Sequence, residues 1–172
     1  MFVKIIGGSI VIMASSILGF ALARDCSRRP NELRTLQAML QMLENEIAFL
    51  SNLLSVAFSN ISNSNKNPVA DIFSSTVNNL KASNMNASEA WTLAVKEVKY
   101  KISLNNEDRE ILINFGKMLG NSDSEGQIKN IRLTLNQLKL QEQKAEVNKN
   151  KNETMYKTLG VLGGIALVIM LF

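Results

Sequence analysis

From residue 33 to residue 54, apolar residues recur at alternating spacings of three and four. They are Leu33, Leu36, Leu40, Leu43, Ile47, Leu50 and Leu54. Such an a/d repeat predicts a long amphipathic helix, and Pro30 and Glu32 suit its first turn. The repeat fits either a coiled-coil dimer or one helix of an antiparallel bundle. We favour the bundle, because further helical segments follow and need a partner.

Two short helices are predicted next. Residues 59–67 are polar and rich in asparagine, which predicts a loop. Apolar stripes then predict helices over residues 68–80 and 88–102, with a break at 81–86. The stripes consist of Val69, Ile72, Phe73, Val77 and Leu80 in the first helix, and of Trp91, Val95, Val98 and Ile102 in the second.

Two more helices complete the middle of the chain. Asn105 or Asn106 is a suitable N-cap for one of them, and Gly120 suits its end. Ser122 or Asp123 is a suitable N-cap for the last helix, which has no stop signal before the chain ends at residue 172. The expected buried residues are Ile111, Leu112, Phe115 and Leu119 in the first, and Ile128, Ile131, Leu135 and Leu138 in the second.

Residues 5–23 contain no charged residue and are about long enough to cross a bilayer. Lys4 precedes this stretch, whereas the larger group of cations follows it, which places its carboxyl side in the cytoplasm. That group is Arg24, Arg28, Arg29 and Arg34. The alternative is a cleaved signal peptide ending at Ala21-Leu22-Ala23. The charge order favours a retained anchor, because a signal peptide has its cations before the apolar stretch.

Residues 159–172 form a second apolar stretch, which spans only about 21 Å as a helix. Tyr156 and Lys157 extend its reach at the interface, so we predict a short transmembrane helix. The alternative is a buried hairpin or a terminal helix packed in the core. Lys149, Lys151 and Lys157 precede the stretch and also indicate a cytoplasmic middle, with both termini on the outer side.

Small residues recur at spacings of four in both apolar stretches. They are Ser15, Gly19 and Ala23 in the first, and Gly160 and Gly164 in the second. This spacing allows helix backbones to approach closely in lipid. We expect these faces to pack on each other or on other proteins.

The predicted architecture is all-α, with a helical bundle flanked by N- and C-terminal transmembrane helices. The predicted transmembrane helices cover residues 5–23 and 158–172, and the bundle domain covers residues 30–140. Residues 141–157 are almost entirely polar and predict a solvated helical stalk.

Composition excludes several kinds of chemistry. The chain has no histidine, one cysteine and a net charge of +4, which excludes histidine-based triads, Cys/His zinc sites and an internal disulfide. Glu44 and Glu46 are two residues apart on a helix, so they make a poor acid/base pair. The acidic group at residues 107–110 suits a helix first turn. We therefore predict a protein that is not an enzyme and binds no cofactor, metal or nucleic acid.

A set of short motifs runs through the chain in order. It begins with Arg28-Arg29-Pro30 after the first apolar stretch and includes Glu89-Ala90-Trp91. It continues with Gly116-Lys117-x-Leu119-Gly120-x-Ser122-Asp123 and Gln127, and closes with Leu159-Gly160-Val161-Leu162-Gly163-Gly164. In these residues the chain resembles the stage III sporulation protein AB family. The 59–67 segment departs from that family, because it lacks the proline-containing pattern expected after the first bundle helix.

The resemblance implies a role in endospore formation, in the mother-cell membrane around the forespore. It implies a non-enzymatic platform in the channel-like assembly between the two cells, with other stage III sporulation proteins, the forespore protein Q and a secretion-type ATPase (stage III sporulation protein AA) as partners. The bundle would be similar to the platform proteins of type II secretion and type IV pili. The contact residues we predict are Glu44, Glu46, Trp91, Gly116, Gly120, Asp123 and Gln127.

Three alternatives stay open at this stage. Trp91 suits the core as well as a partner surface, and Gly120, Asp123 and Gln127 suit helix-end geometry equally well. A signalling membrane protein that transmits its state through a helical pair would also explain heptads next to a membrane span. A membrane enzyme is the third alternative, and the missing histidine argues against it.

Overall fold

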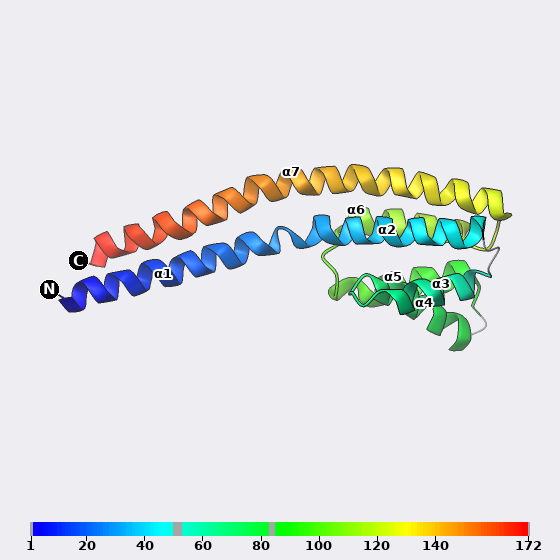
Figure 1. Cartoon of the computed structure of the whole chain (residues 1–172), viewed down its shortest axis with the longest axis horizontal. Coiled ribbons are helices and arrows are strands. Elements are labelled where there is room, and N and C mark those ends of the chain that lie inside the picture. The colour runs from blue at the N-terminus through cyan, green and yellow to red at the C-terminus, as the bar shows by residue number, and fades with distance from the viewer. Residues whose placement is uncertain (1, 50–52, 83–84, 172) are drawn as a thin grey trace. The chain divides into compact units, whose positions relative to one another are not determined.

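The computed structural model describes residues 2–49, 53–82 and 85–171, and all regular structure in these ranges is helical (Figure 1). The elements are α1 (Phe2–Asp25), α2 (Arg28–Ala48), α3 (Leu54–Ser64), α4 (Ala70–Ala82), α5 (Ala87–Glu97), the short 3-10 helix η1 (Val98–Tyr100), α6 (Asn106–Met118) and α7 (Ser124–Leu171). The described ranges contain no strand, which confirms the predicted all-α fold class.

Contacts divide the chain into two units, which are described separately. The paired-helix unit comprises Met1–Pro30 and Lys144–Phe172, and the bundle unit comprises Asn31–Gln143. The division falls inside α7, which is helical on both sides of it. The prediction of a last helix without a stop is therefore confirmed to Leu171.

Four consecutive helices each contribute one aromatic ring to the centre of the bundle unit. Trp91 of α5 stacks on Phe58 of α3 with the ring centroids 5.6 Å apart. Phe73 of α4 and Phe115 of α6 meet the indole edge-on, at 5.3 and 5.2 Å. These geometries are the favourable ones for aromatic pairs. All four side chains are buried, so α3, α4, α5 and α6 share one core.

The leucine repeat of α2 is buried within the chain. Leu33, Leu36, Leu40 and Leu43 have no exposed surface, and Ile131 and Leu138 of α7 are buried as well. Ion pairs from Arg34 to Glu142 and from Glu44 to Arg132 show that α2 and this part of α7 run antiparallel. The repeat therefore serves an intrachain bundle, as we favoured over a coiled-coil dimer.

Two boundary predictions are wrong. The first bundle helix ends at Ala48, and Leu54 begins α3 instead of closing the leucine repeat; Leu50 lies outside the described residues. The predicted loop at 59–67 is helical through Ser64. Ala57, Phe58 and Ile61 bury one face of α3 in the core. This burial outweighs the weak helix preference of the serines and asparagines around them.

Helix ends follow local capping chemistry. The side chain of Asn105 accepts a hydrogen bond from the Asp108 amide and the side chain of Asp108 accepts one from the Asn105 amide, both at 2.9 Å. This capping box identifies Asn105 as the N-cap of α6. The Asp123 carboxylate accepts from the Gly126 amide at 2.9 Å, so Asp123 caps α7. Gly120 has a φ of 75°, which only glycine adopts without strain.

Candidate functional site: an apolar helix pair and the bundle surface

The two helices of the paired-helix unit touch through their backbones at Gly19 and Gly160. A Cβ added to Gly19 would lie 2.8 Å from the Gly160 Cα and 2.8 Å from the Tyr156 carbonyl oxygen. A Cβ added to Gly160 would lie 2.9 Å from the Gly19 Cα. Any larger residue at either position must push the helices apart.

Polar and small side chains extend this contact along the pair. The Ser15 hydroxyl donates to the Gly160 carbonyl at 2.6 Å. A Cβ on Gly164 would come within 3.1 Å of the Ile12 Cα, and Ala23 is buried. The small residues that the sequence singled out therefore pack on each other, which is the first of the two alternatives given above.

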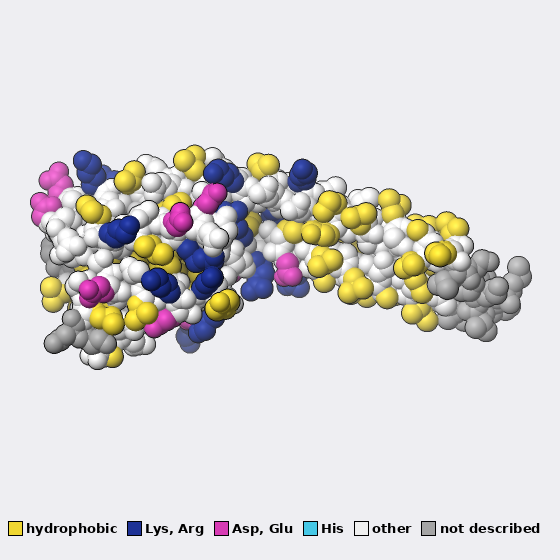
Figure 2. Space-filling model, turned by 180° about the vertical axis from the view of Figure 1, so that it is seen from behind, with side chains coloured by type: hydrophobic (Ala, Val, Ile, Leu, Met, Phe, Trp, Pro, Cys, Tyr) yellow, Lys and Arg dark blue, Asp and Glu magenta, His cyan; other side chains and the backbone are white. Residues whose placement is uncertain are grey.

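The outward faces of this pair are apolar and exposed. Ile10, Ile17 and Ile169 are 61%, 65% and 74% exposed. Figure 2 shows the hydrophobic side chains spread over this part of the chain. Only 17% and 11% of the most apolar windows of the two long helical stretches are buried. These low fractions argue against the alternative of a terminal helix packed in a core. The chain thus has two helices long and apolar enough to span a membrane.

Acidic side chains near the polar end of this pair are neutralised by lysines on the same helix. Lys157 lies 2.6 Å from Glu153 and Lys149 lies 3.0 Å from Glu146. The hydrogen bond and positive charge of Lys157 lower the pKa of the Glu153 carboxyl from its ordinary value. The two residues of each pair are three or four positions apart in the sequence, which is the spacing of ion pairs within a helix.

Glu44 and Glu46 point to different partners in the bundle unit. Glu44 pairs with Arg132 of α7 at 2.6 Å, and Glu46 accepts from the Asn60 amide of α3 at 3.2 Å. The two carboxylates therefore do not share one site. Both side chains keep some exposed surface, so the prediction that they contact a partner stays a prediction.

Trp91 and Gly116 lie in the core. The indole NH of Trp91 donates to the Leu112 carbonyl at 2.8 Å, and the side chain has no exposed surface. A Cβ on Gly116 would lie 2.4 Å from the indole Cδ1. The prediction that Trp91 contacts a partner is therefore wrong, because its side chain is buried in the core. Gly116 leaves the space that the Trp91 ring occupies.

Gly120, Asp123 and Gln127 meet in the α6–α7 turn. The Gln127 side-chain amide donates to the carbonyls of Met118 and Ser122, at 3.2 and 3.4 Å. Gln127 is 4% exposed, so its buried side chain stabilises the turn through these hydrogen bonds. Among the residues that the structure describes, the Gln127 Oε1 and the Ser122 hydroxyl have no hydrogen-bond partner. Gly120, Asp123 and Met118 are exposed on the same turn, so contact with a partner stays a prediction for this surface.

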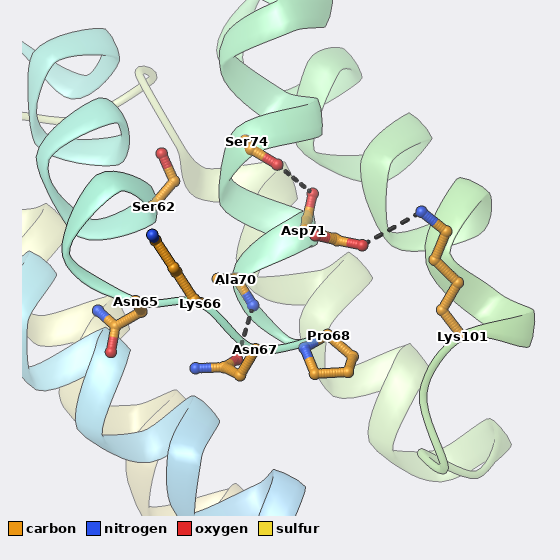
Figure 3. Close-up of a pocket in the computed structure, with 9 residues that line it drawn as sticks. All are labelled: Ser62, Asn65, Lys66, Asn67, Pro68, Ala70, Asp71, Ser74 and Lys101. Atoms are coloured by element: carbon orange, nitrogen blue, oxygen red, sulfur yellow. Dashed lines mark hydrogen bonds and ion pairs between the residues drawn. The ribbon is translucent and has the colours of Figure 1, made fainter.

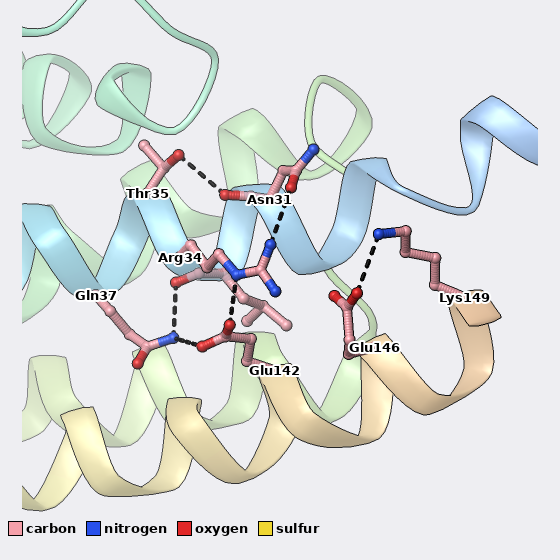
Figure 4. A network of polar contacts seen from close by, with 8 residues as sticks. Asn31, Arg34, Thr35, Gln37, Glu142, Glu146 and Lys149 are labelled. Atoms are coloured by element: carbon pink, nitrogen blue, oxygen red, sulfur yellow. Dashed lines mark hydrogen bonds and ion pairs between the residues drawn. The ribbon is translucent and has the colours of Figure 1, made fainter.

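One polar network was not predicted from the sequence (Figure 4). Glu142 of α7 accepts from the Arg34 guanidinium at 2.6 Å and from the Gln37 amide at 2.9 Å, both on α2. The sequence indicates Arg34 only as one of the cations that follow the first apolar stretch. The partners are more than 100 residues apart in the chain, and no local pattern relates them.

An open polar pocket lies between the end of α3, the start of α4 and Lys101 (Figure 3). The Lys101 ammonium closes one side by pairing with Asp71 at 3.2 Å. Asn67 uses its side-chain oxygen to cap the Ala70 amide. Among the described residues, no group of three or more His, Cys, Asp or Glu side chains lies suitably to hold a metal ion.

Three comparisons with known proteins agree with one another. The family model described as "Stage III sporulation protein AB (spore_III_AB)" matches residues 4–172. "Stage III sporulation protein AB" of Bacillus subtilis (strain 168) is 35% identical over 168 residues, 98% of each chain. A solved structure of "Stage III sporulation protein AB (SpoIIIAB)" is 34% identical and gives a TM-score of 0.67. That similarity covers 72% of this chain and 98% of the solved one.

Proposed function

The chain belongs to the stage III sporulation protein AB family and has a role in sporulation; from this premise we propose that it is a non-enzymatic platform of a membrane assembly. The assembly is the channel-like, type II secretion-related complex between mother cell and forespore that the family resemblance implies. The backbone contact of Gly19 with Gly160 is the observation that carries the proposal. It makes one compact anchor from the two ends of the chain, and the bundle unit is the segment between them.

In the proposed topology both apolar helices cross the mother-cell membrane, and the bundle unit faces the cytoplasm. Arg24, Arg28 and Lys151 lie beyond the polar ends of the apolar stretches, and cytoplasmic flanks are the ones enriched in Arg and Lys. Both termini then face the space between the two membranes. A cytoplasmic bundle is accessible to a cytoplasmic ATPase.

Cysteine accessibility tests this topology. In a Cys26→Ser background, single cysteines replace Ser64 of α3 and Asn121 of the α6–α7 turn, both of which are exposed. We expect an impermeant thiol reagent to label them only after the cells are permeabilised. Labelling in intact cells would place the bundle outside the cytoplasm and would remove the ATPase from the proposal.

The proposed partners are other stage III sporulation proteins, including the secretion-type ATPase. We infer that they contact the partly exposed carboxylates of α2 at Glu44 and Glu46, and the α6–α7 turn at Gly120 and Asp123. Photo-crosslinking from Glu46 and Asn121 in sporulating cells tests this assignment. Adducts at both positions with the ATPase or another stage III protein are expected. Adducts equal to those from the exposed Lys81 of α4 would contradict it.

A non-enzymatic role leads us to expect that sporulation tolerates the loss of carboxylates that have no structural task. Glu110 is exposed on α6 and is such a group. Asp108 is not, because its carboxylate is fully buried in the capping box. Glu110→Gln should therefore sporulate normally. A complete loss in a stably folded Glu110→Gln protein would argue for chemistry.

A further inference from the structure

Three basic side chains gather where the apolar pair ends. Arg24 and Arg28 follow the apolar part of α1, and Lys151 precedes the apolar part of α7. All three are exposed, and none has a hydrogen bond or ion pair among the described residues. Figure 2 shows Lys and Arg side chains beside the start of the yellow apolar region.

The helix pairing places these cations on the same side of the crossing between α1 and α7. Gly19 lies against Gly160 in the antiparallel pair. Arg28 comes nine residues after Gly19, and Lys151 comes nine residues before Gly160. At a rise of about 1.5 Å per residue, Lys151 lies roughly 14 Å from the crossing point along α7. Arg28 begins α2 after the turn at Cys26 and Ser27. Arg24 lies nearer the crossing, directly after the last apolar residue, Ala23.

This region corresponds to the headgroups of a bilayer. Arg24 directly follows Ala23, and Arg28 lies four residues further on, after the turn at Cys26 and Ser27. The headgroup layer beyond the hydrocarbon is roughly 5–8 Å thick on each side. Long basic side chains reach further by snorkelling. The three cations are therefore within reach of lipid phosphates if the apolar pair spans the membrane.

Nearby acids do not cancel the positive charge. Glu153 and Glu146 are paired with lysines on α7. Asp25 is exposed beside Arg24 and opposes one charge. A positive excess remains, and guanidinium groups bind phosphate oxygens through two parallel hydrogen bonds.

We propose that Arg24, Arg28 and Lys151 form a basic collar that binds the phosphate groups of anionic phospholipids at the membrane surface. The collar gives the protein a preference for phosphatidylglycerol over zwitterionic lipid and fixes the depth of the helix pair. This inference rests on the proposed membrane placement but not on the proposed partners.

The test measures lipid selectivity of the full chain in phosphatidylcholine vesicles. Spin-labelled phosphatidylglycerol and spin-labelled phosphatidylcholine report the fraction of lipid immobilised by the protein. One cation near an anionic surface corresponds to about a fivefold change in association. We therefore expect Arg24→Gln/Arg28→Gln/Lys151→Gln to lower the preference for phosphatidylglycerol at least about fivefold.

The matched control removes three exposed lysines of the bundle unit, as Lys81→Gln/Lys129→Gln/Lys139→Gln. It changes net charge equally and should leave the lipid preference intact. Equal loss in the control would overturn the collar, as would an unchanged preference in the collar variant. Release of the immobilised lipid by inorganic phosphate would also overturn it, because the site would then be a general anion site. Failure of the wild-type chain to insert into the vesicles would overturn both the membrane placement and the collar. A preference for phosphatidylglycerol in vesicles that contain no other sporulation protein would support the collar independently of the proposed partners.

Discussion

Gly116 shows how one residue without a side chain can determine the arrangement of a core. The Trp91 indole occupies the space that its Cβ would fill, at 2.4 Å. The ring cannot easily move, because its NH is bonded to the Leu112 carbonyl and it contacts three other aromatic rings. Gly116→Ala should therefore lower the free energy of unfolding by about 1–3 kcal/mol through overpacking.

The single tryptophan of the chain provides the readout, since Trp91 fluorescence should shift to longer wavelength on unfolding. The measurement is denaturant unfolding of the full chain in detergent. Glu110→Ala on the exposed face of the same helix is the control and should change stability little. A Gly116→Ala protein as stable as wild type would show that the indole has room to shift.

Glu44 allows a partner contact to be separated from folding. Its ion pair is with Arg132, whose side chain is 69% exposed, whereas the Glu44 side chain is 17% exposed. Because the Arg132 guanidinium is largely in solvent, the pair should contribute about 1 kcal/mol or less, so Glu44→Gln should change the free energy of unfolding little. If Glu44 contacts a partner, the variant should nevertheless lower the number of heat-resistant spores at least tenfold.

Arg132→Gln is the matched control for Glu44, because it breaks the same ion pair from the other side. It should sporulate normally if the carboxylate itself is recognised. Equal defects in the two variants would instead indicate that the ion pair, and not a partner, is responsible. Normal sporulation of Glu44→Gln would remove Glu44 from the contact surface.

Among the elements, the apolar pair offers a graded test. A Cβ added to Gly19 would lie 2.8 Å from the nearest atom of the facing helix. For a Cβ added to Gly164 this distance is 3.1 Å, and for one added to Gly163 it is 4.0 Å. Alanine substitutions should therefore weaken pairing in that order. We expect a loss of about 1–3 kcal/mol for Gly19→Ala and no resolvable loss for Gly163→Ala, which serves as the control.

Spin labels at Ala21 and Thr158, both exposed, would follow separation of the pair as SDS is added to detergent-solubilised protein. The Cys26→Ser background keeps the labelling specific. The midpoint of separation should fall most for Gly19→Ala. Equal midpoints for Gly19→Ala and Gly163→Ala would contradict the backbone contact at Gly19.

Sequence patterns predicted the elements whose signals are local. Asn105, Gly120 and Asp123 end or begin helices as their side chains suggest, because capping involves only the next three or four residues. The extent of α3 was missed, since its serines and asparagines are weak helix formers. Packing of Phe58 on Trp91, 33 residues away, decides its conformation.

Some features of the candidate site can also be predicted from local sequence, whereas others depend on the folded structure. The small residues of both apolar stretches were visible in the sequence, but their register was not. Ser15 and Gly160 are 145 residues apart, and only the folded helices bring them together. The position of Trp91 in the sequence suits both a surface and a core, and a local pattern cannot decide between them. Its surroundings come from three other helices.

For the molecule as a whole, α7 is helical through the division between the two units after Gln143, whereas α1 ends at Asp25 and α2 begins at Arg28, just before the other division after Pro30. This continuity is the observation that favours the alternative function, a signalling protein that transmits its state along a helix. A platform needs the bundle unit to be held near the membrane, whereas transmission needs an unbroken helix. An insertion after Gln143 can therefore distinguish the two functions.

A Gly-Gly-Ser-Gly-Gly insertion after Gln143 should interrupt α7, because each glycine disfavours the helix by about 1 kcal/mol. If the protein is a platform, we expect heat-resistant spore numbers to fall less than tenfold, since both units keep their internal contacts. A seven-residue helical insertion of alanine, glutamate and lysine adds about two turns and is the control, because it keeps α7 continuous and nearly in phase. If only the glycine insertion abolishes sporulation, while Trp91 fluorescence shows a folded bundle, the result would contradict the platform function. It would favour a signalling protein that transmits its state along α7.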